Sequence, residues 1–173
     1  MILDGKIFPA DHCGEKTTSV QGTQNDLWYS AKAHEHGGNI QALCAPDGFP
    51  LWVADVEPGS VHDVTVAREH VLGALYWAAS HLDLPTLADG GYTGAGIGVH
   101  TPITQPAGGQ TLDADNHTYN ALLRGLCCLG ERGFAVLTGR WRTQHHITAS
   151  PTRIGDIVKA ALVPTHFEHR RSN

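Results

Sequence analysis

Apolar runs of β-strand type dominate the first third of the chain, and helical periodicity begins only after them. The runs are ILDGKIF at residues 2–8, NIQALCA at 39–45 and FPLWVADV at 49–56. The last two are separated by Pro46-Asp47-Gly48, in which Pro fixes φ and Gly accepts a positive φ, so they are predicted to form a β-hairpin. A hairpin followed by alternating helices and strands is typical of an α/β domain, a mixed sheet with helices on its faces.

Helix-type and strand-type patterns alternate over the middle of the chain. Ser60 stands three residues before Asp63, a spacing that predicts a capping box, and apolar residues at helical spacing continue from there to Ala79. Two strand-type runs come next, LPTLAD at residues 84–89 and VHTPI at 99–103, on either side of a glycine-rich turn. These patterns predict one helix followed by two more strands.

Helical patterns fill the last third of the chain. A long helix is predicted from about residue 115 to 139, and another over 153–163, where Pro164 should end it ahead of a frayed basic tail. The sequence contains no internal repeat and no low-complexity tract. We therefore interpret residues 1–166 as one domain and residues 167–173 as a tail.

Charge and cysteine content narrow the class of protein. The 12 Lys and Arg against 17 Asp and Glu give a net charge of −5. This balance argues against a free-standing nucleic-acid coat, but not against a site that meets nucleic acid through divalent metal. Four cysteines without framework spacing, and a start without a signal-peptide pattern, indicate a reducing, cytoplasmic compartment. No apolar run approaches the ~20 residues that span a bilayer, so we expect no membrane partner.

Three acidic residues lie where carboxylates could carry out chemistry. Asp4 lies inside an apolar strand, where a carboxylate is costly unless a cation or hydrogen-bond donors meet it. Asp89 ends a strand at the carboxyl edge, where open α/β sheets bind ligands, and Glu131 lies within the long helix. Carboxylates brought together repel one another unless cations such as Mg²⁺ or Mn²⁺ lie between them. Two such ions about 4 Å apart can activate the attacking oxygen and stabilise the leaving oxygen of a phosphodiester.

Taken singly, each acid also has a simpler interpretation. Asp4 could form a turn at a strand end, Asp89 could form an Asx-turn before glycine, and Glu131 could be a solvated helix residue. The pattern alone leaves both interpretations open.

Five sequence blocks, in order along the chain, resemble the DDE superfamily of transposases, with insertion-sequence and Harbinger-like members the most similar. The blocks are LDGK at Asp4, YSAKAHEHGGNIQ at 29–41, PGSVHD at 58–63, LADGGYTG at 87–94, and GERGF followed by GRWR at 130–142. The resemblance implies an RNase H-like fold and metal-dependent DNA cleavage and strand transfer. It assigns the catalytic, metal-binding triad to Asp4, Asp89 and Glu131, with two Mg²⁺ or Mn²⁺ ions. DNA, as transposon ends and as target, would be the partner, and the bound protein would be nucleoid-associated.

The helix around Glu131 also resembles a Tyr, Arg, Glu, Lys signature of these enzymes. Tyr119, Arg124 and Glu131 match it, whereas Thr138 stands in place of the Lys. Candidate DNA contacts, which could equally be solvated loop or helix-end residues, are Lys32, His34, Arg124, Arg132, Arg140 and Arg142.

Two features of the same blocks concern helices. Gly125, Gly130, Gly133 and Gly139 should each weaken the long helix by about 1 kcal/mol relative to Ala. Asp63 could line the active-site rim, as in the family, but capping the following helix is the simpler role.

The triad begins at residue 4, whereas family members usually carry a helical DNA-binding region before the first acid. We therefore expect a fragment, a decayed copy, or the second frame of a two-frame element. Candidate protein partners are a second copy of the chain and a DNA-binding polypeptide from the upstream frame.

Two rival functions remain open. One is an inert, DNA-associating transposase remnant. The other is a His/Cys metal-binding module using His34 and His36 or the pair His145 and His146, although zinc-type pair spacing is missing and adjacent Cys127 and Cys128 are poor co-ligands.

Overall fold

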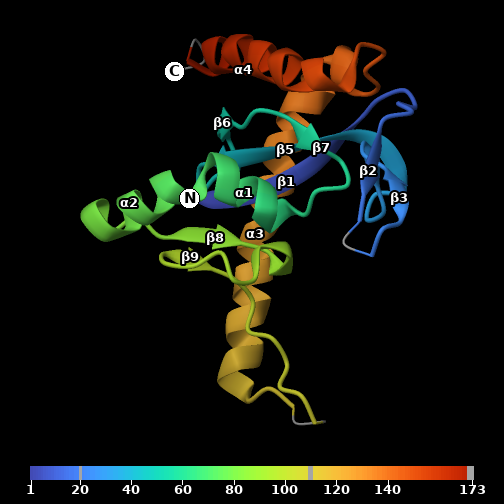
Figure 1. Cartoon of the computed structure of the whole chain (residues 1–173). Helices are drawn as coiled ribbons and strands as arrows, with labels where there is room; N and C mark the ends of the chain where they lie inside the picture. Colours follow the sequence, from blue (N-terminus) through green and yellow to red (C-terminus); the bar gives the residue numbers. More distant parts are fainter. Residues whose placement is uncertain (20, 109–110, 171–173) are drawn as a thin grey trace.

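A mixed β-sheet with helices on both faces forms the body of the protein (Figure 1). The structure, a computed structural model, describes residues 1–19, 21–108 and 111–170. The seven strands of the main sheet are β1 (Ile2–Pro9), β4 (Tyr29–Ser30), β5 (Glu35–Cys44), β6 (Pro50–Val53), β7 (Glu57–Pro58), β8 (Thr86–Ala88) and β9 (Val99–His100). The α/β fold with a mixed sheet, predicted from the pattern of runs, is confirmed.

The order of the strands places β1 at the centre of the sheet. Along the sheet the order is β4-β5-β1-β8-β9, and β6 and β7 also pair with β5. β1 runs antiparallel to β5 and parallel to β8, with Leu3 opposite Ala88. A separate two-stranded sheet is formed by β2 (Lys16–Thr18) and β3 (Gln24–Asp26).

The predicted hairpin is present between β5 and β6. The amide of Ala45 donates to the carbonyl of Phe49, and Gly48 adopts a φ of +84°, as the Pro-Asp-Gly turn predicts. The strand expected at 99–103 is shorter than predicted, because only Val99 and His100 pair with β8.

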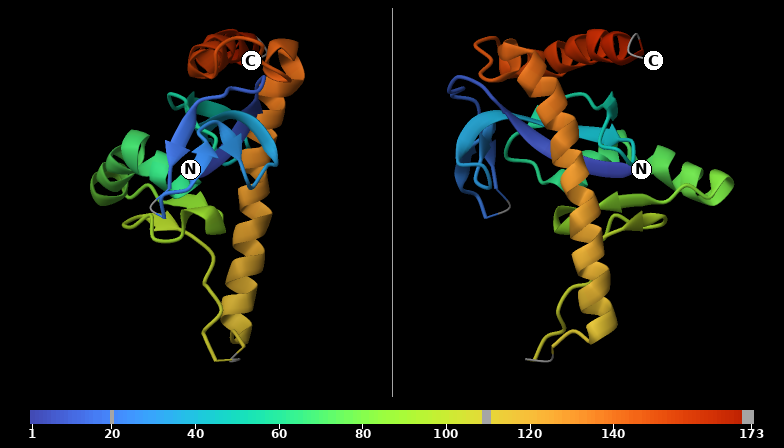
Figure 2. Two further views of the ribbon diagram at one scale, coloured as in Figure 1. Left: turned by 45° about the vertical axis from the view of Figure 1, so that its right-hand side comes forward. Right: turned by 180° about the vertical axis from the view of Figure 1, so that it is seen from behind.

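Helices cover both faces of the sheet. Figure 1 shows α1 and α2 in front of the strands, and Figure 2, seen from behind, shows α3 crossing the opposite face. Their bounds are α1 (Asp63–His70), α2 (Leu72–Leu82), α3 (Ala114–Arg140) and α4 (Ile154–Arg170), with short 3₁₀ turns η1 (Gly90–Tyr92), η2 (Arg142–Gln144) and η3 (Pro151–Arg153). Among the described helices, none has both the length and the apolarity required to cross a membrane.

The sheet separates two hydrophobic cores. The core under α1 and α2 includes Leu3, Leu72, Leu75, Ala88 and Tyr92, and the core under α3 and α4 includes Ile2, Phe8, Ile40, Phe134, Leu137 and Val158. Successive residues of a strand point to opposite faces. Ile2 and Leu3 therefore belong to different cores, and Asp4 shares the face of Ile2 beneath α3.

The single helix expected after Ser60 is wrong in two respects. Helix α1 begins at Asp63, with His62 as an N-cap residue that makes no side-chain cap hydrogen bond, so Ser60 forms no capping box. The helix also breaks at Val71, whose φ of −138° is not helical. Residues on both sides of the break, Ala67 and Val71 before it and Leu72 and Leu75 after it, are buried in the same core.

The expected helix end near Pro164 is also wrong, because α4 continues to Arg170. Proline removes one backbone hydrogen bond, but tertiary contacts hold the residues that follow it. Trp141 Nε1 donates to Thr165 Oγ1 at 3.0 Å, and His166 Nε2 lies 2.7 Å from the carbonyl oxygen of Pro50. The predicted tail therefore begins within a helix, and residues 171–173 lie outside the described part of the chain.

Candidate active site

The three predicted catalytic acids lie around one cavity. The parallel pairing of Leu3 with Ala88 brings Asp4 and Asp89, each one residue further on, to the same edge of neighbouring strands. Helix α3 crosses this face of the sheet (Figure 2) and carries Glu131. Together the three acids, with Leu3, Arg124, Cys127 and Cys128, line a cavity of about 270 Å³, called the acidic cavity below.

Two glycines allow α3 to approach the sheet closely. A Cβ on Gly130 would lie 2.7 Å from Cβ of Asp4 and 3.0 Å from its Oδ2. A Cβ on Gly133 would collide with Sγ of Cys44 on β5. These two positions, predicted only to weaken the helix, are where it contacts the strands. Around Gly125 and Gly139 there is open space, so the packing explanation does not extend to them.

Backbone amides fix one oxygen of each aspartate. The amide of Gly5 donates to Oδ1 of Asp4 at 2.8 Å, and the amide of Gly91 donates to Oδ1 of Asp89 at 2.8 Å, where Asp89 caps η1. Within the described part of the chain, Oδ2 of each aspartate has no hydrogen-bond donor. The two amide bonds therefore fix the orientation of both carboxylates that line the acidic cavity.

Acidic residues outnumber basic ones among the described residues that line the acidic cavity. Burial raises the pKa of Asp4 to about 6, and the charges of Asp89, Asp63 and Glu131 raise it too, against the opposing effect of the Gly5 amide. Arg124 is the one basic residue that lines this cavity, and its Nε donates to the carbonyl oxygen of Asn120 at 3.2 Å. Burial raises the pKa of the neighbouring Cys127 thiol to about 11, so this thiol is a neutral part of the wall.

Asp63 is a fourth acid at this edge of the sheet, and its expected capping role is not seen. A Cβ on Gly91 would lie 3.0 Å from Oδ1 of Asp89 and 3.4 Å from Oδ2 of Asp63, so Gly91 separates the two carboxylates. Lys32 Nζ donates to Oδ2 of Asp63 at 2.9 Å, and Asn39 Nδ2 donates to its Oδ1 at 2.8 Å. The geometry therefore favours the other interpretation of Asp63, a position at the rim of the active site.

Of the predicted DNA contacts, Arg124 and Lys32 lie close to the acids. Lys32, His62 and Asp63 line a second cavity, of about 330 Å³, and the pKa of Lys32 is raised mainly by its hydrogen bond to Asp63. His34 is exposed in a left-handed conformation, with a φ of 58°, and does not line either cavity.

The other predicted arginines do not line the acidic cavity. Arg140 makes two hydrogen bonds to Glu168 of α4, at 3.0 and 2.7 Å. Arg132 lies beside Gly48, and Arg142 is exposed in η2. Thr138, in place of the signature Lys, donates its hydroxyl to the carbonyl oxygen of Phe134 at 2.9 Å.

A buried chain of polar side chains supports Asp63, and the sequence analysis missed it. The Tyr92 hydroxyl donates to Oε1 of Gln41, Gln41 Nε2 donates to Oδ1 of Asn39 at 2.9 Å, and Asn39 donates to Asp63. Asn39 and Gln41 are two residues apart on β5 and are fully buried. Two amide side chains on one face of an otherwise apolar strand are the signal that could have indicated this chain.

His145 and His146, one histidine pair of the rival metal-binding module, contact different residues, whereas His36 of the other pair lies in a group with His12 and Asp26. His145 Nε2 lies 2.7 Å from the carbonyl oxygen of Thr138, whereas His146 Nε2 lies 2.8 Å from Oδ1 of Asp11. Among the described residues, neither pair forms a group of three or more potential metal ligands with Cys127 or Cys128.

Comparison with known proteins identifies the family. The family model described as DDE superfamily endonuclease matches residues 3–164, a segment that contains all three acids. No curated protein and no solved structure matches the chain. The chain belongs to the DDE superfamily of endonucleases, and the resemblance found in its five sequence blocks is confirmed.

Proposed function

We propose that this DDE superfamily endonuclease is a transposase catalytic domain that cleaves DNA at insertion-sequence ends and joins the freed end to target DNA, using divalent metal ions. The observation that carries the proposal is the convergence of Asp4, Asp89 and Glu131 on one cavity, from two parallel strands and a helix. Water would attack a phosphodiester at the element end and leave a 3′ hydroxyl and a 5′ phosphate. The 3′ hydroxyl would then attack a phosphodiester of the target, which joins it to the target's 5′ phosphate and releases a target 3′ hydroxyl.

The donor set of the acidic cavity fits Mg²⁺ or Mn²⁺. Its candidate ligands are carboxylate oxygens, which these hard cations prefer, and burial together with repulsion from the neighbouring acids makes the negative charge of Asp4 costly without a cation. The family resemblance implies two such ions, which would lie about 4 Å apart between the three acids. When bound, such ions would polarise the attacking oxygen and stabilise the charge on the leaving oxygen.

The remaining residues of the site would position DNA. The guanidinium of Arg124 would meet a phosphate beside the acids, because charge-assisted hydrogen bonds to phosphate favour arginine. Lys32 is exposed beside Asp63 and would contact the backbone of the same strand. The Gly5 and Gly91 amides hold the aspartates in place while the substrate binds.

The test is cleavage of supercoiled plasmid DNA by the full chain with Mg²⁺ or Mn²⁺. We expect nicking that stops when a chelator is added and falls at least about 100-fold in Asp89→Asn. This substitution keeps the oxygen that accepts from Gly91, so the turn at η1 survives. Asp115→Asn, at an exposed position near the start of α3, is the matched control and should nick at the parental rate.

Equal nicking by Asp89→Asn and the parent would show that the acid at 89 is not catalytic. Absence of nicking by the parent with either metal, while its fold is intact by circular dichroism, would favour the inert remnant instead.

A further inference from the structure

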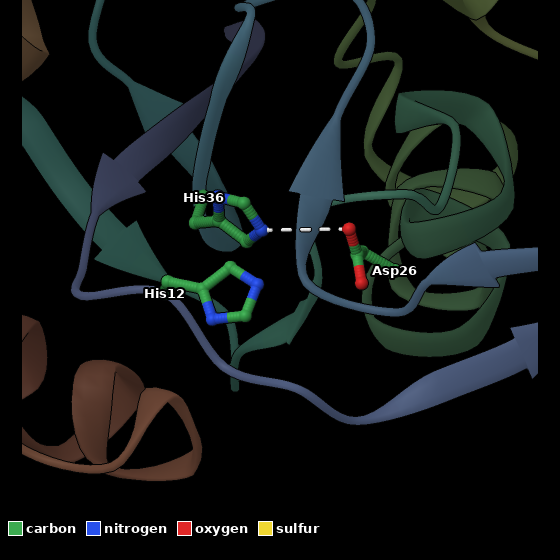
Figure 3. Close-up of side chains that lie close together, drawn as sticks. All are labelled: His12, Asp26 and His36. Carbon is green, nitrogen blue, oxygen red and sulfur yellow. Dashed lines mark ion pairs between the residues drawn. The ribbon is translucent and has the colours of Figure 1, made fainter.

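Three potential metal ligands from separate segments meet at the far end of β1 from the acidic cavity. His12 follows β1, Asp26 ends β3, and His36 lies near the start of β5. Figure 3 shows the two imidazole rings and the carboxylate grouped together. One ligand atom from each residue lies within 4.8 Å of the other two, and no other such group occurs among the described residues.

The contacts inside this group leave ligand atoms available. His36 Nε2 lies 3.8 Å from Oδ2 of Asp26, which is too long for a hydrogen bond. This nitrogen is buried and has no hydrogen-bond partner in the described part of the chain. Lys16 binds the other oxygen of Asp26, so Oδ2 remains directed at His36. A buried imidazole nitrogen without a partner is unfavourable unless something binds it.

We propose that His12, Asp26 and His36 bind one divalent transition-metal ion, with Zn²⁺ as the fitting ion. Two imidazoles and a carboxylate form a ligand set that suits zinc rather than magnesium. Zinc bonds of about 2.0–2.1 Å in a tetrahedral site separate ligand atoms by about 3.4 Å, so the 3.8 Å contact needs only a small contraction. His12 is exposed, so its ring can move to complete that contraction, and water can occupy the fourth position.

The site is separate from the acidic cavity. The amide of Ala10 donates to the carbonyl oxygen of His36, which places His36 beside a residue six positions beyond Asp4 on the same extended segment. At about 3.3 Å per residue, this corresponds to roughly 20 Å. The ion therefore takes no part in the proposed DNA chemistry.

The position of the ligands indicates a structural role. Strands β2 and β3 form a sheet of their own, outside the main sheet. An ion shared by Asp26 of β3 and His36 of β5 would fasten this hairpin to the main sheet. Metal binding should therefore slow amide exchange in the hairpin, where Leu27 N donates to the carbonyl oxygen of Glu15.

The experiment uses the full chain carrying Asp89→Asn, which weakens metal binding at the acidic cavity. Chelator-treated protein is titrated with Zn²⁺ in competition with a chromophoric chelator, and hydrogen exchange of residues 15–27 is followed with and without zinc. Adding His12→Ala should weaken zinc binding at least about 100-fold and abolish the zinc-dependent protection. His12→Cys should restore both, because a thiolate is also a zinc ligand. The control is His34→Ala, at an exposed histidine outside the group, which should bind zinc as the Asp89→Asn parent does.

Zinc binding that His12→Ala leaves unchanged would overturn the proposal, as would failure of the Asp89→Asn parent to bind one zinc ion per chain. Zinc binding without protection of the hairpin would overturn the structural role.

Discussion

Replacing Gly130 by alanine has two opposing effects: alanine favours the helix, but its Cβ would collide with Asp4. In an ordinary helix the change should stabilise by about 1 kcal/mol. Here the added Cβ would lie 2.7 Å from Cβ of Asp4, whereas carbon atoms in contact normally stay about 3.5–4.0 Å apart. Either α3 or the strand must therefore move by about 1 Å, and overpacking of this kind typically costs about 1–3 kcal/mol. The net expectation is a loss of up to about 2 kcal/mol in the free energy of unfolding.

The effect on catalysis should be larger than the effect on stability. A displacement of about 1 Å at a reacting centre can cost on the order of 100-fold in rate. Glu131 follows Gly130 directly, so a shift of α3 moves Glu131 relative to both Asp4 and Asp89. Gly130→Ala should therefore reduce metal-dependent nicking by about 10-fold to 100-fold while the protein remains folded.

Gly139→Ala is the matched control, because a Cβ there meets nothing within 4 Å and the position is exposed. It should raise the free energy of unfolding by up to about 1 kcal/mol and leave nicking unchanged. Urea unfolding and plasmid nicking measure the two effects. If Gly130→Ala is more stable than the parent and equally active, the close approach of α3 to Asp4 does not constrain the site.

Three further predictions concern charge and buried polarity. Because the pKa of Asp4 is raised to about 6 from 3.8, the folded chain holds a proton that the unfolded chain loses between these values. The free energy of unfolding of the metal-free protein should therefore rise by on the order of 1–3 kcal/mol as the pH falls from 7 to 4, which urea unfolding in the presence of a chelator measures. An equal rise in Asp4→Asn would contradict this assignment. Lys32→Ala removes the exposed partner of Asp63, whose carboxylate keeps its hydrogen bond from Asn39, so the free energy of unfolding should fall by about 1 kcal/mol or less. The slope of log DNA affinity against log salt should become shallower by about 1, and an unchanged slope excludes a phosphate contact. Gln41→Leu leaves the buried polar groups of Tyr92 and Asn39 without their partner, so it should lower the free energy of unfolding by about 2–4 kcal/mol, measured with urea. A decrease below about 1 kcal/mol would show that these buried hydrogen bonds are dispensable.

Features that depend on neighbouring residues in the sequence were predicted well. The Pro-Asp-Gly turn specifies its own φ angles, so the β5–β6 hairpin follows from it. The long helical period specifies α3 within a residue at each end, 115–139 predicted against Ala114–Arg140 observed. In both cases local backbone preference and the tertiary structure agree.

Features that depend on distant packing were not predicted. The break at Val71 falls inside a run of apolar residues at helical spacing, so the periodicity of the sequence does not indicate it. Pro164 normally ends a helix, but Thr165 and His166 are held by Trp141 and Pro50, far away in sequence. The short strands β2, β3, β4 and β7 owe their pairing to partners rather than to an apolar pattern of their own.

The sequence predicted the three acids of the candidate site, but not the buried residues that hold the neighbouring Asp63 in place. The pattern and the family resemblance identified Asp4, Asp89 and Glu131, which the structure brings around one cavity. The roles of Asn39 and Gln41 were not predicted, although two amide side chains on one face of β5 were a signal for them, and the rim position of Asp63 was only the alternative to helix capping. Grouping Arg132, Arg140 and Arg142 by charge alone did not anticipate that they lie outside the acidic cavity.

Glycines beside the acids explain how so much negative charge fits at one edge of the sheet. Gly5 supplies the amide that binds Asp4, and its missing Cβ leaves room on the other face, where Oδ1 of Asp63 would lie 2.9 Å from such an atom. Gly91 does the same for Asp89, binding its carboxylate while making space for Asp63. Gly130 then admits the helix that carries Glu131. Gly5 and Gly91 each combine an amide donor with close packing against a second carboxylate. Gly5, Gly91 and Gly130 are therefore part of how the site is built, and each should tolerate alanine less well than its local backbone conformation alone would suggest.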